Sequence, residues 1–540
     1  MKLDNRLSLK YFLFFWIKRG IRYLLSNLKY KKKNLSQFEN LILKIKKIFK
    51  DNKLKKKFIL FVCLDEFPIF FFIIWSLVSL KLYKKNYGIK IISTKKNIKI
   101  NKLSKFLNFK IRNIEDQKQK NKDSVVVTRK INNLNTAKDF YNFKYQNFDL
   151  GYMIISNFCR IHKVGFINFD SYLQKRILKN SLKQFIKEYQ ALFKDDFYKD
   201  IKITYTFEKN LFPYLHFFLF SIKRNINLIH WAGSNLSENS FILRKYNKKN
   251  IYLHHSTITS QNWKIGHKIS QKKILNYNKK IFNQRYSGKF KPFAQNLLTV
   301  KSNFINKRND RAKKNCIIFS HILHDTLYFY GKEYYDSYAH WLVATVKSAC
   351  QNDNLNWYVK FHPSNIYRGE FKRGKSKEED ILRQSIKKIP PHVKFIYPDD
   401  KVSALGWMKF ADIGVTIRGT SGLEMATMGK PVFTCGRNRY ENRGFTIDSK
   451  NHLDFEKKLK NLPHVKQIKS TKDKANKFFY FLFAKKIFNC DFIKVIKNNK
   501  SSFSWDKINY KLDNNFLNKK TLSQFSKFVL SNKATEFLNK

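Results

Sequence analysis

Small residues gather in one stretch of a chain that is otherwise rich in lysine, asparagine, isoleucine and phenylalanine. From Thr416 to Gly436 the sequence reads TIRGTSGLEMATMGKPVFTCG, and seven of the 17 glycines lie between Gly406 and Gly444. Glycine allows the backbone to approach a ligand closely, and hydroxyls beside free helix amides can hydrogen-bond an anion. The stretch therefore predicts a phosphate-binding turn.

This turn connects a predicted strand, Ile413–Ile417, to a short predicted helix, Ser421–Met428. Unpaired amides at the start of a helix attract anions, and an arginine in the turn can add a charge-assisted contact. Glu424 has two interpretations, because it stands at capping-box spacing from Ser421 and could instead hold ribose hydroxyls. The predicted anion-binding residues of the turn are Arg418, Gly419, Thr420, Ser421, Gly422 and Glu424.

A histidine directly follows another predicted strand. The segment FHPSN places His362 and Pro363 after the strand Asn356–Phe361. Parallel strands end at one edge of a sheet and proline fixes the chain direction, so we expect the imidazole to face the same crevice as the glycine-rich turn. His362 is also a candidate catalytic residue, because a donor there would stabilise charge on a departing phosphate.

The segment SHILHD follows a third predicted strand, Cys316–Phe319. Its position at a strand end makes Ser320, His321 and Asp325 candidates for the same ligand. The alternative is a histidine-rich turn that packs internally.

The N-terminal half offers candidates of its own. Asp65 and Glu66 follow the first predicted strand, where a carboxylate could act as the catalytic base or could cap the next helix. His254 and His255 close the predicted strand Ile251–Thr257 and are candidates for binding a second substrate. Adjacent strand residues point to opposite faces, so at most one of the two histidines should reach a crevice.

Neither a metal nor an organic cofactor is predicted. The pair Asp195-Asp196 lies in a charged helical stretch, and Asp400 of the pair Asp399-Asp400 precedes a helix that it could cap. The six cysteines form no CxxC pair and have no zinc-like spacing with histidine. They are predicted to be buried thiols in a reducing cytoplasm.

Strands and helices alternate along the chain, which predicts an α/β fold of two Rossmann-like, doubly wound parallel sheets. In the first half, strands are expected at residues 58–64, 89–94 and 227–233 and a helix at 237–247. The predicted divisions are a basic helical extension (1–57), an N-terminal domain (58–275), a crossover linker (276–314), a C-terminal domain (315–453) and a helical C-terminal extension (454–540).

The formal charge of +69 has two explanations. Codon drift in an AT-rich genome enriches lysine and asparagine along a whole chain, whereas a polyanionic partner, nucleic acid or an anionic membrane, selects basic residues. The sequence shows no helix-turn-helix, zinc finger or aromatic RNA-binding signature, so no nucleic-acid partner is expected.

Two segments bear on membrane contact. Tyr11–Lys33 joins an aromatic run to basic residues, which predicts either a helix lying on an anionic membrane or one packed on the protein itself. Phe58–Leu82 is apolar but is interrupted by Asp65, Glu66 and Pro68, so we expect a strand, a turn and a buried helix in place of a span. The predicted location is cytoplasmic, with peripheral contact at the inner face of the membrane.

The segments FHPSN, ADIGVTIRGTSGLEMATMGKPVFTCGRNRY and GFTIDS resemble the C-terminal half of bacterial capsule polysaccharide biosynthesis glycosyltransferases, which include Kdo (3-deoxy-manno-octulosonate) transferases. The resemblance covers about Cys316–Ser449 and extends, more distantly, to polysialyltransferases and CDP-glycerol glycerophosphotransferases. It implies a GT-B fold, with a nucleotide-sugar on the C-terminal domain and the acceptor on the N-terminal one. It also implies that His362, Thr420 and Ser421 contact donor phosphates and that Glu424 contacts the nucleotide. Arg418 departs from relatives that carry glutamine or a small residue there.

The resemblance implies sugar transfer from a CMP- or other NDP-linked donor to a glycan or glycolipid acceptor in surface polysaccharide synthesis. Amides, hydroxyls and cationic groups can stabilise the leaving phosphate without a metal, and His362, Arg418 and the helix start at Ser421 form such a set. Alternatives are a CDP-glycerol-type glycerophosphotransferase, a nucleotide-sugar 2-epimerase and, from a different class, a basic nucleic-acid-binding protein. The donor sugar, the acceptor and the stereochemical outcome stay open.

Overall fold

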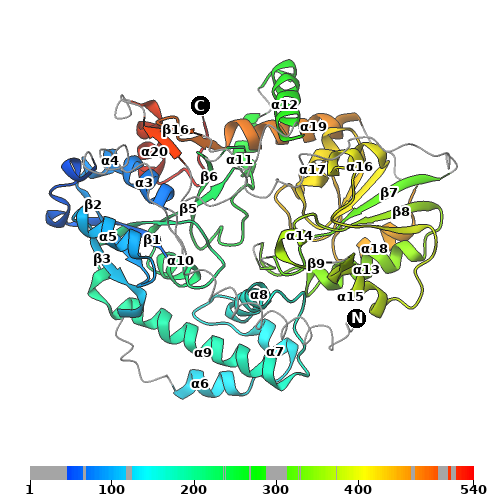
Figure 1. Ribbon diagram of the computed structural model, residues 1–540, viewed down its shortest axis with the longest axis horizontal. Helices are drawn as coiled ribbons and strands as arrows, with labels where there is room; N and C mark the ends of the chain where they lie inside the picture. Colours follow the sequence, from blue (N-terminus) through cyan, green and yellow to red (C-terminus); the bar gives the residue numbers. More distant parts are fainter. Residues whose placement is uncertain are drawn as a thin grey trace. The chain divides into compact units, whose positions relative to one another are not determined.

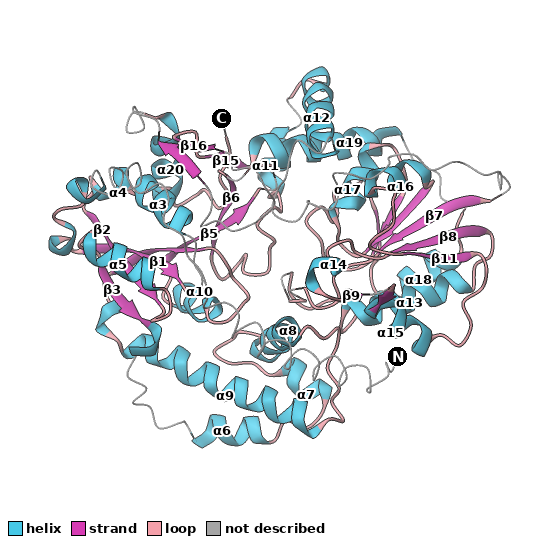
Figure 2. Cartoon of the chain, viewed as in Figure 1, coloured by secondary structure: helices cyan, strands magenta, loops and turns pink. Residues whose placement is uncertain are grey.

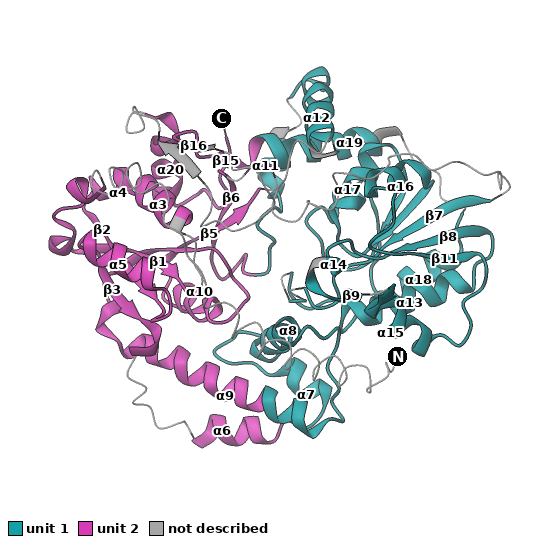
Figure 3. Cartoon of the chain, in the orientation of Figure 1, with its two compact units in different colours: residues 1–26, 135–178, 252–484 teal, residues 27–134, 179–251, 485–540 magenta. Residues whose placement is uncertain are grey.

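The computed structural model describes residues 45–539, except 65–68, 117–124, 235, 238, 267–268, 287–312, 326, 329, 373, 464–468, 497–508 and 513–518. The chain divides into two compact units, which Figure 3 colours separately. Unit 1 contains the described parts of residues 135–178 and 252–484, and unit 2 contains those of residues 27–134, 179–251 and 485–540. Each unit is built around one large sheet.

In the six-stranded sheet of unit 1, every neighbouring pair of strands is parallel. The strand order is β11-β8-β7-β12-β13-β14, so the chain adds strands first on one side of β7 and then on the other. The order reverses between β7 and β12, and such a switch point leaves a crevice beyond the carboxyl ends of the strands. The strands are β7 (Lys314–Phe319), β8 (Leu355–Lys360), β11 (Val393–Ile396), β12 (Ile413–Thr416), β13 (Val432–Thr434) and β14 (Ile447–Asp448).

Helices surround this sheet in Figure 2. Two of them start at serine caps: Ser337 Oγ accepts the His340 N–H at 3.2 Å, and Ser403 Oγ accepts the Gly406 N–H at 3.0 Å. The helices of unit 1 are α7 (Ala137–Asn142), α8 (Leu150–His162), α11 (Ser260–Gly266), α12 (Gln271–Tyr286), α13 (Tyr338–Cys350), α14 (Asn365–Arg368), α15 (Lys377–Ser385), α16 (Ala404–Phe410), α17 (Thr420–Thr427), α18 (His452–Lys460) and α19 (Lys469–Tyr480).

Unit 2 repeats the same winding. Its sheet has the order β15-β6-β5-β4-β1-β2-β3, with β1 to β5 parallel and with β6 and β15 antiparallel to their neighbours. The order here reverses between β1 and β4. The strands are β1 (Lys57–Cys63), β2 (Tyr87–Ser93), β3 (Lys110–Asn113), β4 (Ile201–Thr206), β5 (Asn227–Gly233), β6 (Ser240–Tyr246) and β15 (Ile487–Asn489), and the helices include α3 (Ile69–Val78), α4 (Leu80–Tyr83), α5 (Ile98–Phe106), α10 (Tyr214–Lys223) and α20 (Lys520–Leu530).

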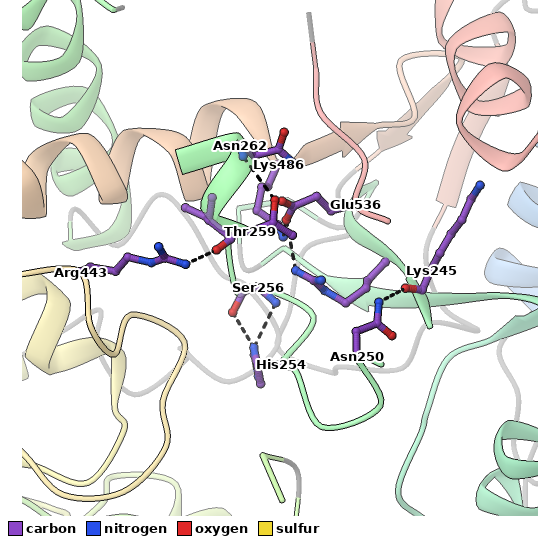
Figure 4. Close-up of polar contacts among 11 residues, drawn as sticks. Lys245, Asn250, His254, Ser256, Thr259, Asn262, Arg443, Lys486 and Glu536 are labelled. Atoms are coloured by element: carbon purple, nitrogen blue, oxygen red, sulfur yellow. Dashed lines mark hydrogen bonds and ion pairs between the residues drawn. The ribbon is translucent and has the colours of Figure 1, made fainter. Parts of the chain in front are cut away.

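The C-terminal segment completes the core of unit 2. Phe488 and Phe525 pack against the indole of Trp231, with ring centroids 5.7 and 5.3 Å apart. Buried charges reinforce this packing, because Glu536 pairs with both Arg244, at 3.1 Å, and Lys486, and all three side chains are at most 1% exposed. Figure 4 shows Lys486 and Glu536 pointing toward each other. Residues 485–540 are therefore part of unit 2.

The fold class predicted from the sequence, two parallel-dominated α/β sheets, is confirmed. Every strand predicted in the C-terminal half is present within two residues, and β1, β2 and β5 also match their predicted runs. Apolar runs such as CIIF in β7 are buried on both faces, as central parallel strands require.

Two predicted elements are wrong. The helix expected at residues 237–247 is the strand β6, because its buried aromatic and aliphatic side chains pair with β5 and β15 on either side. The strand expected at Ile251–Thr257 is a series of turns. There the Ser256 backbone N–H donates to His254 Nδ1 at 3.1 Å, a local bond that competes with strand pairing.

The compact units also divide the chain differently from the predicted boundaries. Residues 135–178 and 252–275 lie in unit 1 although the sequence assigned them to the N-terminal domain. Asp149 explains part of this, because its carboxylate accepts hydrogen bonds from Tyr252 and Tyr328, which lie far apart in the chain. The predicted C-terminal extension separates into α18 and α19 in unit 1 and residues 485–540 in unit 2.

Residues 45–57 belong to unit 2 and pack into its body, where Phe49 is fully buried and Asn52 Oδ1 accepts the Ile89 N–H at 2.7 Å. The predicted membrane helix Tyr11–Lys33 lies outside the described residues. None of the helices in the described part of the chain combines the length and the apolar character that a bilayer crossing requires.

Replacing Glu536 with glutamine should lower the free energy of unfolding by about 3–5 kcal/mol, because Arg244 would keep its buried charge without a counter-charge and Lys486 would lose its ion-pair partner. Urea denaturation would measure the loss. Asp116→Asn is the matched control, since it breaks an exposed pair with Lys95 at 2.8 Å, which solvent screens, and it should cost far less stability than the Glu536 variant. Equal losses in the two variants would contradict the role assigned to Glu536.

Candidate functional site

Three segments singled out in the sequence meet at one edge of the unit 1 sheet. Ser320 follows β7, His362 follows β8, and the turn beginning at Arg418 follows β12. These strands are neighbours in the order β8-β7-β12. With adjacent strands about 4.8 Å apart, the histidine and the turn flank β7 at a separation of roughly 10 Å. A ligand contacting both would pass over Ser320 at the switch point.

The glycine-rich turn is tightly packed. Tyr440 donates its hydroxyl to the Gly419 carbonyl at 2.8 Å, and Thr416 Oγ1 accepts the Gly419 N–H at 3.2 Å. A β-carbon on Gly422 would lie 2.5 Å from the Tyr440 hydroxyl, and one on Gly419 would lie 2.9 Å from Ser421 Oγ. Close packing therefore favours glycine at Gly422, where the obstacle is a buried tyrosine, whereas at Gly419 a rotation of the Ser421 hydroxyl could relieve the contact.

The turn leaves the start of α17 open. Gly419 is the N-cap and no side chain caps the helix, so the first amides, those of Thr420 and Ser421, have no acceptor within the described chain. Both residues are half-exposed. Uncapped amides at the positive end of a helix form an anion site.

The capping-box interpretation of Glu424 is wrong, because Ser421 occupies the second helical position and not the N-cap. Glu424 is buried within α17.

Arg418 occupies a buried position beside this turn. Its Nη2 lies 2.5 Å from Glu333 Oε1, and the guanidinium lies 4.5 Å from the Tyr330 ring centre and 5.0 Å from that of Tyr338. The side chain is only 3% exposed. Its charge is thus compensated within the protein, and Arg418 fastens residues 330–338 to the end of β12.

Gly436, after β13, helps to seat the same ion pair. Its φ of +107° favours glycine, and a β-carbon there would lie 2.7 Å from Glu333 Oε2. The neighbouring Arg437 N–H donates to that oxygen at 3.1 Å.

His362 is a neutral hydrogen-bond donor. The Ser364 N–H donates to its Nδ1 at 3.2 Å, which leaves the ring proton on Nε2. Burial, together with the charges of His321 and Arg368, lowers the pKa of His362 to about 3. The imidazole therefore offers an N–H without a positive charge at neutral pH.

His321 and Asp325 differ in charge. His321 Nδ1 donates to the Ile322 carbonyl at 3.2 Å, and burial lowers its pKa to about 4. Asp325 pairs with Arg160 of α8, and although burial opposes ionisation, the guanidinium holds the pKa of Asp325 at about 2. A carboxylate this acidic is a weak general base, because base strength follows pKa.

Three residues that the sequence did not single out, His324, Arg368 and Glu370, contact one another beside Asp325 at this edge of the sheet. His324 Nδ1 lies 3.1 Å from Glu370 Oε1, and its Nε2 lies 3.5 Å from Arg368 Nη1. Burial raises the pKa of Glu370 to about 7. Arg368 and Glu370 come shortly after FHPSN, so the charged residues that follow the histidine-proline turn could have indicated their place at this edge. The sequence around Arg160 contains no comparable signal.

His254 and His255 lie in unit 1, which corrects their predicted place in the N-terminal domain. The His254 ring stacks on Tyr330 with centroids 5.0 Å apart and planes 8° apart, and its Nδ1 lies 2.5 Å from Ser256 Oγ. Figure 4 shows His254 directed toward Ser256. The His255 ring packs on that of His254, with centroids 3.8 Å apart, so both histidines lie in the turns beside Tyr330.

Asp65 and Glu66 lie outside the described residues. Within the described ranges, no group of three or more histidine, cysteine or acidic side chains could hold a metal ion. The six cysteines are unpaired thiols.

No protein-family model matches the chain, and no curated sequence is similar enough to count as a match. Among solved structures, the chain is similar to KpsC, a beta Kdo 2,4 transferase from Thermosulfurimonas dismutans, at 13% identity and a TM-score of 0.30, covering 52% of this chain and 80% of that one. A glycosyltransferase from Rickettsia africae ESF-5 gives 9% identity and a TM-score of 0.27, covering 79% and 93%. UDP-GlcNAc 2-epimerase from Methanocaldococcus jannaschii, in complex with UDP-GlcNAc and UDP, gives 14% identity and a TM-score of 0.27, covering 79% and 99%.

Gly422→Ala should destabilise the protein by about 1–3 kcal/mol, because the added methyl group would overlap the buried Tyr440 hydroxyl. Chemical denaturation measures the change. Gly233→Ala is the control, since no atom lies within 4 Å of its β-carbon position. Similar stabilities for both variants would show that the turn can open to accept a side chain.

The free energy of unfolding should fall as the pH drops below about 6.5, because the unfolded chain takes up protons on histidines that stay neutral in the folded protein. His362, with a pKa of about 3, and His321, with a pKa of about 4, both contribute. Denaturation between pH 4 and 7 should show a smaller slope for His362→Gln than for the wild type. An unchanged slope would mean that His362 is already protonated in the folded protein.

Proposed function

We propose that the chain is a nucleotide-sugar-dependent glycosyltransferase whose donor phosphates bind at the carboxyl edge of the unit 1 sheet. The observation that carries the proposal is the unsatisfied hydroxyl of Ser320. Its hydroxyl is buried at the switch point, at 7% exposure, and has no hydrogen-bond partner among the described residues. A buried hydroxyl without a partner is costly, and a ligand oxygen would satisfy it.

The neighbours of Ser320 have the chemistry that a leaving nucleotide needs. The α17 amides supply fixed donors, the helix adds partial positive charge, and His362 adds an Nε2–H. Such preorganised donors stabilise the phosphate charge that develops as the bond to the sugar breaks. In this proposal Pro363 and Gly419 set the backbone, Thr420 and Ser421 hold phosphate, and Glu424 is on the nucleotide side.

Arg418 takes a positioning role in this proposal. Because Glu333 compensates its charge, its effect on the donor passes through Tyr330 and Tyr338, which it holds beside His254 and His321. His254 and His255 would then line the donor side. The proposed catalytic base, or group assisting retention, remains Asp65 or Glu66 after β1, since Asp325 is too acidic for that task.

The finer assignment is surface or capsule polysaccharide synthesis with a Kdo-like sugar, and it rests on the resemblance of FHPSN and GTSGLE to that family. The acceptor would be a glycan or glycolipid at the inner face of the cytoplasmic membrane. A CDP-glycerol-type glycerophosphotransferase would use the same phosphate site, so the ligand screen below has to separate the two.

Binding of CMP-, CDP-, UDP- and dTDP-linked compounds should be measured by calorimetry and by the rise in melting temperature. Ser320→Ala and His362→Ala should each weaken the best ligand by roughly 10- to 100-fold, as expected for hydrogen bonds to a charged group. His392→Gln is the control, because it removes an imidazole at the opposite edge of the same sheet, before β11. If no nucleotide binds, or if the control weakens binding equally, the proposal fails. Preference for CDP-glycerol over every nucleotide-sugar would favour the glycerophosphotransferase.

A further inference from the structure

A cavity of about 700 Å³ opens at the other edge of the unit 1 sheet. It lies where α16 and α17 end, ahead of β12 and β13, and α12 and α19 form its remaining walls (Figure 1). The donor site proposed above lies beyond the opposite ends of the strands. The lining residues are Leu275, Asn278, Lys279, Phe282, Asn283, Leu405, Lys409, Thr427, Met428, Lys430 and Asn476.

The lining combines apolar and basic side chains, and none of these residues is acidic. Leu275 is 44% exposed although it is a large aliphatic residue, and Phe282, about two helical turns further along α12, is half-exposed. Lys279 and Lys409 are exposed at the rim. The composition suits a ligand that joins an anionic group to an apolar one.

The negative end of the α16 dipole does not repel an anion from this cavity. A helix C-terminus normally carries partial negative charge, but Lys430 Nζ donates to the Lys409 carbonyl at 2.6 Å and to the Ala411 carbonyl. This lysine therefore compensates the terminal carbonyls of the helix, and Lys279 and Lys409 add their charge to the rim.

Asn278 gives a second, independent sign of a ligand. Its Nδ2 donates to the Asn476 carbonyl at 3.0 Å and to Asn476 Oδ1 at 2.9 Å, which fixes the amide. Asn278 lines the cavity and is 3% exposed, and its Oδ1 has no hydrogen-bond partner in the described part of the chain. A buried amide oxygen is normally hydrogen-bonded, so a ligand with a donor such as a hydroxyl would satisfy it.

We propose that this cavity binds the headgroup of an anionic phospholipid and docks unit 1 on a membrane surface. The phosphate meets Lys279 and Lys409, a headgroup hydroxyl donates to Asn278 Oδ1, and the start of an acyl chain contacts Leu275 and Phe282. Lysines on the exposed side of α12, Lys272, Lys273 and Lys280, extend the attraction to neighbouring lipids.

Charge and shape select this occupant over two others. A second copy of a chain with a formal charge of +69 would be repelled from a lysine rim. A nucleic-acid backbone has no group to cover the exposed Leu275 and the apolar floor beneath it.

Cosedimentation of the full chain with vesicles tests the proposal. Vesicles of phosphatidylcholine with phosphatidylglycerol should bind the protein, and vesicles of phosphatidylcholine alone should bind it much more weakly. The double variant Lys279→Gln/Lys409→Gln should lower the partition coefficient roughly 30-fold. Leu275→Asn should lower it further at high salt, where apolar contact contributes more of the affinity.

The matched control is Lys102→Gln/Lys105→Gln, which removes the same charge from exposed positions on α5 and should change binding less than about threefold. Equal losses in the two double variants would overturn the proposal, because they would indicate attraction by net charge alone. An unchanged partition coefficient for Lys279→Gln/Lys409→Gln, or tighter binding to an oligonucleotide than to vesicles, would also overturn it. Nucleotide binding by the variants reports folding and tests the donor site separately.

Discussion

The parallel pairing of β7 with β12 is the constraint on which the rest of unit 1 depends. Residues 316–319 pair directly with residues 413–416, so two segments almost a hundred positions apart share one ladder. The chain leaves these strands toward opposite sides, and the space between the two departing loops cannot be filled by either. Ser320 and the start of α17 face that space because of the winding. The Arg418–Glu333 pair and the two tyrosines beneath it then hold the loop layer in place.

Periodicity and turn chemistry predicted most of unit 1, because its strands are short apolar runs bounded by glycine, proline and serine. They also predicted that His362 and the turn at Gly419 lie at one edge of the sheet. They failed where distant pairing decides the outcome: β6 is a strand because β5 and β15 flank it, and His254 belongs to unit 1 because Tyr330 lies against it. Arg418 illustrates a further limit, since the sequence showed a cation in a turn but could not show that Glu333 neutralises it.

The basic side chains of the chain are used inside as well as outside. Lys209 is buried and donates to the Ile251 carbonyl at 2.8 Å, and Lys245 donates to the Val529 carbonyl at 2.9 Å, while Arg244 and Lys486 share Glu536. Each of these basic side chains satisfies carbonyls or a carboxylate that would otherwise be buried without a partner. Even if codon drift is the origin of these lysines, the fold of unit 2 now depends on their contacts.

The return of residues 485–540 to the first sheet has a consequence for biosynthesis. During translation, the strands β1 to β6 leave the ribosome long before β15, α20 and Glu536 exist, so β6 has an unpaired edge and Arg244 has no counter-charge. Unit 1, whose sheet lies entirely between residues 314 and 448, can close first. The strand β6 therefore stays unpaired on one side until β15 has been synthesised. In that interval it presents an open β-edge of the kind that chaperones shield.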